Sequence, residues 1–351
     1  MTRFALALAF LSLTFPSFAQ QQAPFQERIE VTAVLLDVIV TDADGNQILG
    51  LGKDDFVVRE NGVAQTIDSV DYFTNRRLLT GREEQAPFKV EQVREDRYFT
   101  FFFDKPSNPA VLFDQLTLAR EAVKDFLDED MKETDYVAIV GHDVRLKVYS
   151  DFTNDKEQLR KALNESTRFG RGITKAPAGD GPSILRNLST REMVDRTGTV
   201  YQALDLLADS LGSIKARKNL VLFSPGIADR DESLMGDMLV NRSRYLDPAL
   251  ESLNAANVSV YGVQLQRDVD TSPLFHQRLG EISDVTGGRY FRMNLSFQPA
   301  LEQIEQTNSG YYLVTYRSPH SRGEKGFQKV DVSVKNPEFK VIARSGYEYG
   351  N

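Results

Sequence analysis

The chain has 351 residues, which is more than one small domain needs and suits two domains. It is 41% hydrophobic and 26% charged, as globular proteins are, and its net charge of −8 argues against a general nucleic-acid binder, which needs a basic surface. Cysteine is absent, so disulfides, thiol chemistry, zinc–thiolate sites and lipid attachment through an N-terminal cysteine are excluded.

Residues 1–19 have the pattern of a signal peptide. Arg3 supplies the positive start, residues 4–15 form an apolar core, and Ser17 and Ala19 are the small residues of a cleavage site. A membrane anchor is the alternative, but the apolar run is too short to span a bilayer and Pro16 interrupts it. We therefore expect cleavage after Ala19 and export to the periplasm or the extracellular space. No other stretch is long and apolar enough to cross a membrane, so we expect no transmembrane segment in the mature chain.

Residues 28–73 have the pattern of an all-β segment. Strands are expected at 28–40, 56–60 and 65–73, with a hairpin turn at Asn61-Gly62. The stretch from Asp42 to Asn46 is expected to be a turn rather than a calcium loop, because an EF-hand needs Gly at its sixth position and Glu at its twelfth. Residues 74–96 are polar and charged, which indicates a linker.

Residues 98–104 read Tyr-Phe-Thr-Phe-Phe-Phe-Asp, an unbroken apolar run that ends on Asp104. This pattern predicts a strand buried on both faces, because neither face alternates to polar residues. Pro106 and Pro109 end the strand, and a helical period follows over 111–127. Asp104 is therefore expected at the carboxyl end of a strand, where ligands bind in open α/β sheets.

The chain from 97 to 307 alternates between strands and helices, which predicts a doubly wound α/β sheet. Strands are expected at 135–141, 144–150, 219–223, 258–264 and 289–292. Helices are expected at 155–164, with Asn154 as a plausible cap, and at 199–211, 242–256, 274–286 and 297–307. Gly287-Gly288 is the expected stop of the fourth helix.

β patterns return at 310–317, 329–334 and 339–344, the last of which is the expected final strand. About seven short strands from the two ends of the chain could close one β-sandwich. The α/β domain would then be inserted into that sandwich, which close termini make easy.

Residues 166–195, called the basic flap below, are rich in Gly, Pro and Arg and show no clear period. A structureless run of this length is usually functional or disordered. We hypothesise that it contacts a partner or covers the crevice at the strand ends, and a mobile solvent loop is the alternative. Its cations are Arg168, Arg171, Lys175, Arg186 and Arg191.

Four stretches (101–104, 135–149, 197–204 and 220–226) together resemble a von Willebrand factor type A (VWFA) domain. The whole chain is similar to the exported VWFA-related proteins of acidobacteria, through Asp44-Gly45 and Glu60-Asn61-Gly62 near the start and Arg344-Ser345-Gly346-Tyr347 near the end. The resemblance implies a Rossmann-like type A domain at 97–308, between β segments at 28–73 and 309–349.

The resemblance also implies Mg²⁺ at a metal-ion-dependent adhesion site (MIDAS), built from Asp-x-Ser-x-Ser, a Thr and a second Asp. Asp104 fits the first Asp, but Pro106 and Pro225 stand at two ligand positions. The tentative metal ligands are Asp104, Ser107, Asn108 and Thr199, with Thr197 and Asp229 near the remaining positions. The alternatives are that Asp104 is a buried acid satisfied by loop N–H groups and that Thr199 caps a helix.

An enzyme is not expected. Ser224 stands in half of a hydrolase nucleophile elbow, but the elbow needs Gly where Leu222 stands. Pro225 follows the serine and has no N–H for an oxyanion hole. The histidines, His142, His276 and His320, lie far apart in the chain, and we interpret His142 as a turn residue.

These patterns predict an exported, adhesion-type module that binds a protein partner at the carboxyl edge of the type A sheet. The expected edge comprises Asp104, Ser107, Asn108, Thr197, Thr199, Ser224 and Asp229. The alternative is a metal-free structural or assembly protein of the cell envelope. Neither the partner's identity nor the oligomeric state follows from the sequence.

Overall fold

The computed structural model describes residues 29–43, 45–74, 90–91, 96–105, 113–214, 216–227, 234–235, 238–239, 242–265, 273–292, 296–321 and 325–349. The expected signal peptide, Ser107, Asn108 and Asp229 lie outside these residues. Within the described part of the chain, no helix has the length and apolar character needed to cross a bilayer.

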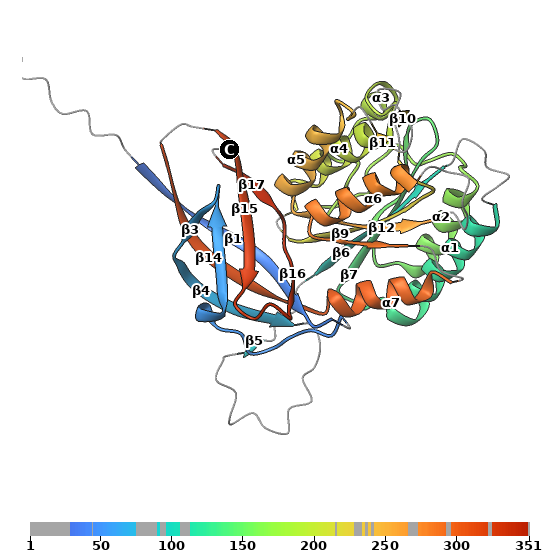
Figure 1. Cartoon of the computed structure of the whole chain (residues 1–351). Coiled ribbons are helices and arrows are strands. Elements are labelled where there is room, and N and C mark those ends of the chain that lie inside the picture. The colour runs from blue at the N-terminus through green and yellow to red at the C-terminus, as the bar shows by residue number, and fades with distance from the viewer. Residues whose placement is uncertain are drawn as a thin grey trace, which may run out of the picture.

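The chain forms a mixed α/β structure with a β-rich part beside an α/β part (Figure 1). Strands from both ends of the chain make up the β-rich part, and the chain between them makes up the α/β part. Pairing of β1 (Ile29–Thr41) with β14 (Gly310–Ser321) brings the two end segments together.

The α/β part is built on a six-stranded sheet. In spatial order its strands are β13 (Arg289–Phe291), β12 (Val258–Gln264), β9 (Lys218–Ser224), β6 (Arg97–Asp104), β7 (Asp135–His142) and β8 (Leu146–Thr153). All neighbours are parallel except β7 and β8. The chain builds outward from β6 on one side and then from β9 on the other, so this is the order of a doubly wound sheet and its switch point lies between β6 and β9.

Strand β6 is buried on both faces, as its apolar run predicts. Phe99, Phe101 and Phe103 belong to one buried cluster, and Tyr98 and Phe102 belong to another. Burying each such phenylalanine stabilises the fold by roughly 1.5–3 kcal/mol. Helices must therefore cover both faces of the sheet.

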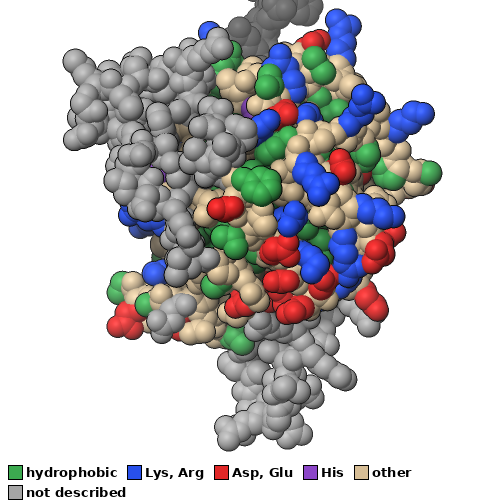
Figure 2. Space-filling model, turned by 90° about the vertical axis from the view of Figure 1, so that its right-hand side faces the viewer, with side chains coloured by type: hydrophobic (Ala, Val, Ile, Leu, Met, Phe, Trp, Pro, Cys, Tyr) green, Lys and Arg blue, Asp and Glu red, His purple; other side chains and the backbone are tan. Residues whose placement is uncertain are grey.

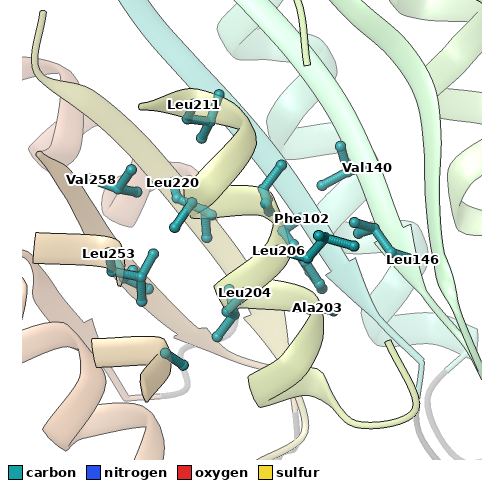
Figure 3. Close-up of a cluster of buried hydrophobic side chains, with 14 of the residues drawn as sticks. Phe102, Val140, Leu146, Ala203, Leu204, Leu206, Leu211, Leu220, Leu253 and Val258 are labelled. Atoms are coloured by element: carbon teal, nitrogen blue, oxygen red, sulfur yellow. The ribbon is translucent and has the colours of Figure 1, made fainter. Parts of the chain in front are cut away.

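The helices divide between the two faces (Figure 1). The first cluster is completed by α1 (Phe113–Asp125), α2 (Lys156–Thr167) and α7 (Gln298–Thr307). The second is completed by α4 (Val200–Leu211), α5 (Leu246–Ala255) and α6 (Pro273–Val285). Figure 3 shows Leu204, Leu206 and Leu211 of α4 packed among Phe102 and Leu220 of the sheet.

The β-rich part contains two sheets. One has the order β16 (Lys340–Ile342), β1, β14, β4 (Ile67–Thr74) and β5 (Val90–Glu91), and the other has the order β17 (Gly346–Tyr349), β15 (Gly326–Val334), β2 (Phe56–Glu60) and β3 (Val63–Gln65). Both sheets contribute side chains to a third buried cluster, among them Leu36 and Tyr312 from the first sheet and Val58 from the second.

A buried carboxylate connects these two sheets. Glu60 of β2 is 8% exposed, and it accepts hydrogen bonds from the hydroxyls of Tyr316 at 2.7 Å, Ser318 at 2.5 Å and Tyr347 at 2.8 Å. Tyr316 and Ser318 come from β14, and Tyr347 comes from β17. A buried charge costs free energy unless it is hydrogen-bonded, and here three donors satisfy it.

Two predictions about single turn residues are confirmed. The hairpin expected at Asn61-Gly62 is confirmed, since β2 pairs with β3 and both turn residues have positive φ, 48° and 83°. The stop expected after α6 is also confirmed, since Gly287 has φ 68° and its amide donates to Asp284 O. Positive φ of this kind favours glycine and asparagine.

Other expectations at element ends were wrong. The helix expected at 155–164 begins at Lys156, and its cap is Asp155 rather than Asn154, because the Asp155 carboxylate accepts from the Glu157 and Gln158 amides. The strand expected at 339–344 is not the last, since β17 follows and pairs with β15. Strand β5 lies inside the expected linker, and β10 (Leu234–Met235) pairs with β11 (Met238–Leu239) where no strand was expected. β5 and β17 are set by pairing with β4 and β15, strands elsewhere in the chain that the local sequence does not show, whereas β10 and β11 form a short local pair.

Stability at alkaline pH tests the Glu60 network. Burial raises the pKa of Tyr347 to about 12, and the neighbouring Glu60 carboxylate acts in the same direction. The folded state therefore keeps this phenol protonated at pH values where the unfolded phenol ionises, so its contribution to stability is complete below pH ~10 and decreases as pH rises to about 12. We expect the free energy of unfolding in urea to fall less steeply over this window in Tyr347→Phe than in the wild type. Equal slopes in the two proteins would contradict this role of Tyr347.

Candidate functional site

Four polar side chains lie along the edge where the central strands end. Asp104, His142, Ser224 and Gln264 are the last residues of β6, β7, β9 and β12. Asp104 pairs in register with His142, and Ser224 pairs with Gln264, so the four lie along one edge of the sheet. The switch point falls between Asp104 and Ser224, where ligands bind in doubly wound sheets.

Asp104 and Ser224 are in direct contact. The Ser224 hydroxyl donates to Asp104 Oδ2 at 2.7 Å and accepts from the Gly226 amide at 3.1 Å. Asp104 is 5% exposed and Ser224 is fully buried. The structure thus brings together the two residues that the sequence placed at neighbouring strand ends.

His142 is the third member of this group, and we had interpreted it as a turn residue. Its Nε2 lies 3.0 Å from Thr197 O, and its Nδ1 lies 3.8 Å from Asp104 Oδ1. A carbonyl oxygen only accepts, so Nε2 carries the proton, and Nδ1 carries one only when the ring is cationic. The available signal was its place at the end of the strand after β6, equivalent to that of Asp104.

This group does not form a nucleophilic triad. The Ser224 hydroxyl donates to a carboxylate, whereas an activated serine needs a general base such as an imidazole beside it. Pro225 follows Ser224 and has no N–H to stabilise an oxyanion. The described geometry at Ser224 is therefore not that of an activated serine nucleophile.

The two threonines expected near this edge use their hydroxyls to hold the chain. Thr197 is fully buried, and its Oγ1 donates to Met193 O and accepts from the Leu146 amide at 2.9 Å. Thr199 is the N-cap of α4, and its Oγ1 accepts from the Gln202 amide at 3.2 Å. The helix-cap alternative for Thr199 is therefore what the structure shows.

The basic flap is anchored to the α/β part. Asp151 of β8 is 2% exposed and accepts from the Ser183 hydroxyl and the Ile184 amide, both at 2.7 Å, and from the Leu185 amide at 3.2 Å. The flap also contains α3 (Thr190–Asp195), which begins with a capping box between Ser189 and Glu192. The expectation of a structureless run was wrong here, because the carboxylate that organises the flap lies outside it.

Both ends of the flap reach the carboxyl edge. Lys105, next to Asp104, places its Nζ 5.1 Å from the centre of the Phe169 ring, and Thr197, two residues beyond the other end of the flap, contacts His142. The flap therefore borders the Asp104–Ser224 pair, as the hypothesis of a flap beside the crevice requires.

The flap cations divide into two groups. Arg186 donates to Gly179 O and Gly181 O, and Arg191 pairs with Asp195 at 3.3 Å. The other three are exposed and form no ion pair with a described residue; they are Arg168, Arg171 and Lys175. Figure 2 shows the face of the α/β part that points away from the β-rich part, where Lys and Arg side chains are spread widely and Asp and Glu gather lower down.

The described residues do not by themselves make up a Mg²⁺ site. No group of three or more His, Asp or Glu that could hold a metal occurs among them. At this edge they offer one carboxylate and one serine hydroxyl, which already bond to each other, whereas Mg²⁺ prefers six oxygen ligands. The expected ligands Ser107 and Asn108 lie outside the described part of the chain, and so does Asp229.

Comparisons with known proteins found no matching family model and no matching curated protein. Among solved structures, the chain is similar to an aerotolerance-related membrane protein from Bacteroides fragilis, with 13% identity and a TM-score of 0.39 over 60% of this chain and 98% of that one. It is similar to a mutant of the PilB minor pilin from Streptococcus sanguinis, with 12% identity and a TM-score of 0.39 over 77% and 78%. A mussel byssus protein, proximal thread matrix protein 1 with a zinc-occupied MIDAS motif, shows 14% identity and a TM-score of 0.38 over 61% and 48%. At these scores no ligand or partner transfers to this chain.

Calorimetric titration with Mg²⁺ or Mn²⁺ tests the metal question. We expect no saturable heat from the mature protein, because the hydroxyls of Thr197 and Thr199 and the Asp104–Ser224 pair are engaged within the fold. Asp104→Ala should behave identically. Saturable binding that disappears in Asp104→Ala would contradict this expectation and would indicate an intact adhesion site.

Proposed function

We propose that the chain is an exported protein-interaction module that binds a protein partner at the carboxyl edge around Asp104 and Ser224. The observation that carries this proposal is the Asp104–Ser224 pair at the switch point of a doubly wound sheet. Open α/β sheets bind their ligands at this position. Export rests on the signal-peptide pattern of residues 1–19.

The architecture that we propose is a type A domain, residues 97–308, inserted into a β-sandwich formed by 28–73 and 309–349. Three observations support it: the doubly wound strand order, the antiparallel β8 beside β7, and the β1–β14 pairing that joins the two ends of the chain. The buried cluster shared by the two sheets of the β-rich part supports the sandwich.

The charge beside the edge indicates the chemistry of the partner. Arg168, Arg171 and Lys175 are exposed and form no ion pair with a described residue, although the chain as a whole carries a net charge of −8. A basic patch on an acidic protein attracts an acidic partner and speeds its association. We therefore propose a partner that presents an acidic surface to the flap and a basic side chain to Asp104, because among the described residues this carboxylate contacts a neutral hydroxyl and an imidazole rather than a Lys or Arg.

Binding at this edge is proposed to be independent of metal. A MIDAS holds Mg²⁺ through hydroxyls and carboxylates, but Thr197 and Thr199 use their hydroxyls to fix the turn before α4. The same observation favours a second candidate, a metal-free structural or assembly protein of the cell envelope. The two candidates differ in whether the Asp104 charge matters for binding.

Affinity capture from the envelope fraction of the source cells tests the role of Asp104. We expect the mature protein to enrich a specific partner, and Asp104→Asn to reduce that enrichment about tenfold, because a charge at the binding edge is removed while a side-chain acceptor for Ser224 is kept. EDTA should leave capture unchanged, and thermal unfolding should show that the variant is folded. Equal capture by both proteins would favour the assembly role instead.

Charge reversal tests the basic flap. We expect the triple variant Arg168→Glu, Arg171→Glu, Lys175→Glu to slow association with the captured partner about tenfold at low salt, because it removes electrostatic steering. A matched control reverses three exposed lysines of the β-rich part, Lys325→Glu, Lys329→Glu and Lys335→Glu, and should associate like the wild type. Equal slowing in both variants would show that only net charge matters.

A further inference from the structure

A cavity lies between the two parts of the molecule, at the edge of the sheet opposite Asp104. Its volume is about 740 Å³, within the range of small-molecule sites. It is lined by residues at the amino ends of β6 and β9, by the end of α5, and by the outer face of β1 and β14. Nothing in the proposed function uses this cavity.

One wall of the cavity is apolar. Along β1, Leu36 and Val38 point into the core of the β-rich part, so the alternate residues Leu35 and Ile39 face the other way and line the cavity. Leu35 is 50% exposed, which is unusual for a large apolar side chain in mid-strand. Phe73, Tyr311 and Leu313 extend this wall.

The cavity is also lined by two arginines, Arg217 and Arg344, that form no ion pair with a described residue. Arg217 Nη2 donates to Gly287 O at 2.9 Å and lies 3.5 Å from the Tyr261 hydroxyl, and Arg344 Nη2 donates to Leu35 O at 2.8 Å. The Nε atoms of both are buried and have no hydrogen-bond partner among the described residues. Both arginines are half-buried, so each guanidinium is partly withdrawn from water, which is costly unless an anion balances its charge.

Among the described residues, no acid forms an ion pair with Arg217 or Arg344, although the Asp37 charge acts on Arg344 from nearby. Asp135 accepts two 2.7 Å hydrogen bonds from Arg97. Asp37 accepts a 2.7 Å hydrogen bond from the Asn257 side-chain amide rather than from an arginine. Asp96 also lines the cavity, but it is exposed to water. Burial lowers the pKa of Arg344, the nearby Arg217 acts in the same direction, and Asp37 opposes them.

Asn219 adds a polar side chain to the same wall. It is 3% exposed, and its amide oxygen has no hydrogen-bond partner among the described residues. Buried amides normally find partners, so the Asn219 oxygen is an acceptor for a donor group of a ligand, and it does not contribute to holding the anionic group.

We propose that this cavity binds a small organic anion, with a carboxylate or phosphate group held by Arg217 and Arg344 and an apolar body against Leu35 and its neighbours. Guanidinium groups match both kinds of oxyanion in geometry. Because the site lies at the opposite edge from Asp104, it is independent of the proposed partner binding. Bound anion would contact both parts of the molecule and stabilise them together.

Titration of the full mature protein with four compounds tests this proposal. The probes are 3-phenylpropionate, phenyl phosphate, the neutral 3-phenylpropionamide and inorganic phosphate. We expect at least one organic anion to bind with Kd below ~1 mM by calorimetry and to raise Tm, while the neutral amide does neither. The two organic anions distinguish a carboxylate ligand from a phosphate ligand, and inorganic phosphate shows how much the apolar body contributes.

Two variants and two controls locate the binding. Arg344→Gln and Arg217→Gln should each weaken binding of the organic anion about tenfold or more, which is about 1.4 kcal/mol. Arg317→Gln removes an exposed arginine, whose side chain is 70% exposed, and should bind like the wild type, as should Asp104→Asn. If Arg344→Gln does not fold, the anion binding of Arg217→Gln alone tests the proposal.

The proposal is overturned if neither organic anion binds at about 10 mM, far above the expected Kd. It is also overturned if the neutral amide binds equally well, or if a folded arginine variant binds like the wild type. Loss of partner capture in Asp104→Asn with unchanged anion binding would leave this proposal intact, so the two proposals can fail separately.

Discussion

Burial of β6 on both faces is the constraint on which the rest of the structure depends. Phe99, Phe101 and Phe103 need cover on one side, and Tyr98 and Phe102 need it on the other. Helices on both faces provide that cover, which requires a doubly wound order with β6 at its centre. The same strand fixes the position of a charged residue at each of its ends.

The charged residues at the two ends of β6 differ in how their charge is balanced. At the amino end, Arg97 bonds to Asp135 through two 2.7 Å contacts and lies 3.3 Å from Glu305, so its charge is balanced within the fold. At the carboxyl end, the contacts of Asp104 with described side chains are a neutral serine hydroxyl at 2.7 Å and an imidazole at 3.8 Å. Burying a carboxylate without a Lys or Arg partner is costly. We therefore assign binding to this edge.

The sequence predicted the core of this arrangement because its signals are local. One apolar run ends on Asp104 and another ends on Ser224, and these runs predict two strands and their last residues. The two strands are parallel, so both end at the same edge of the sheet. The contact of His142 with Thr197, the Asp151 anchor of the flap and the short β17 were not predictable in this way. Each depends on a partner distant in the chain, as when Arg344 reaches Leu35 across 309 positions. Ser107, Asn108 and Asp229 remain predictions.

Site-specific photo-crosslinking tests the central claim most directly. Gly198 is exposed between the two edge threonines, and a side chain there would make only ordinary contacts, the nearest at 3.5 Å from Gln202 Oε1, so it can accept p-benzoylphenylalanine. We predict a crosslink to one acidic protein from position 198, lost on adding Asp104→Asn, and none from Lys329 in the β-rich part. Equal crosslinks from both positions, or a crosslink from Lys329 alone, would contradict partner binding at the carboxyl edge.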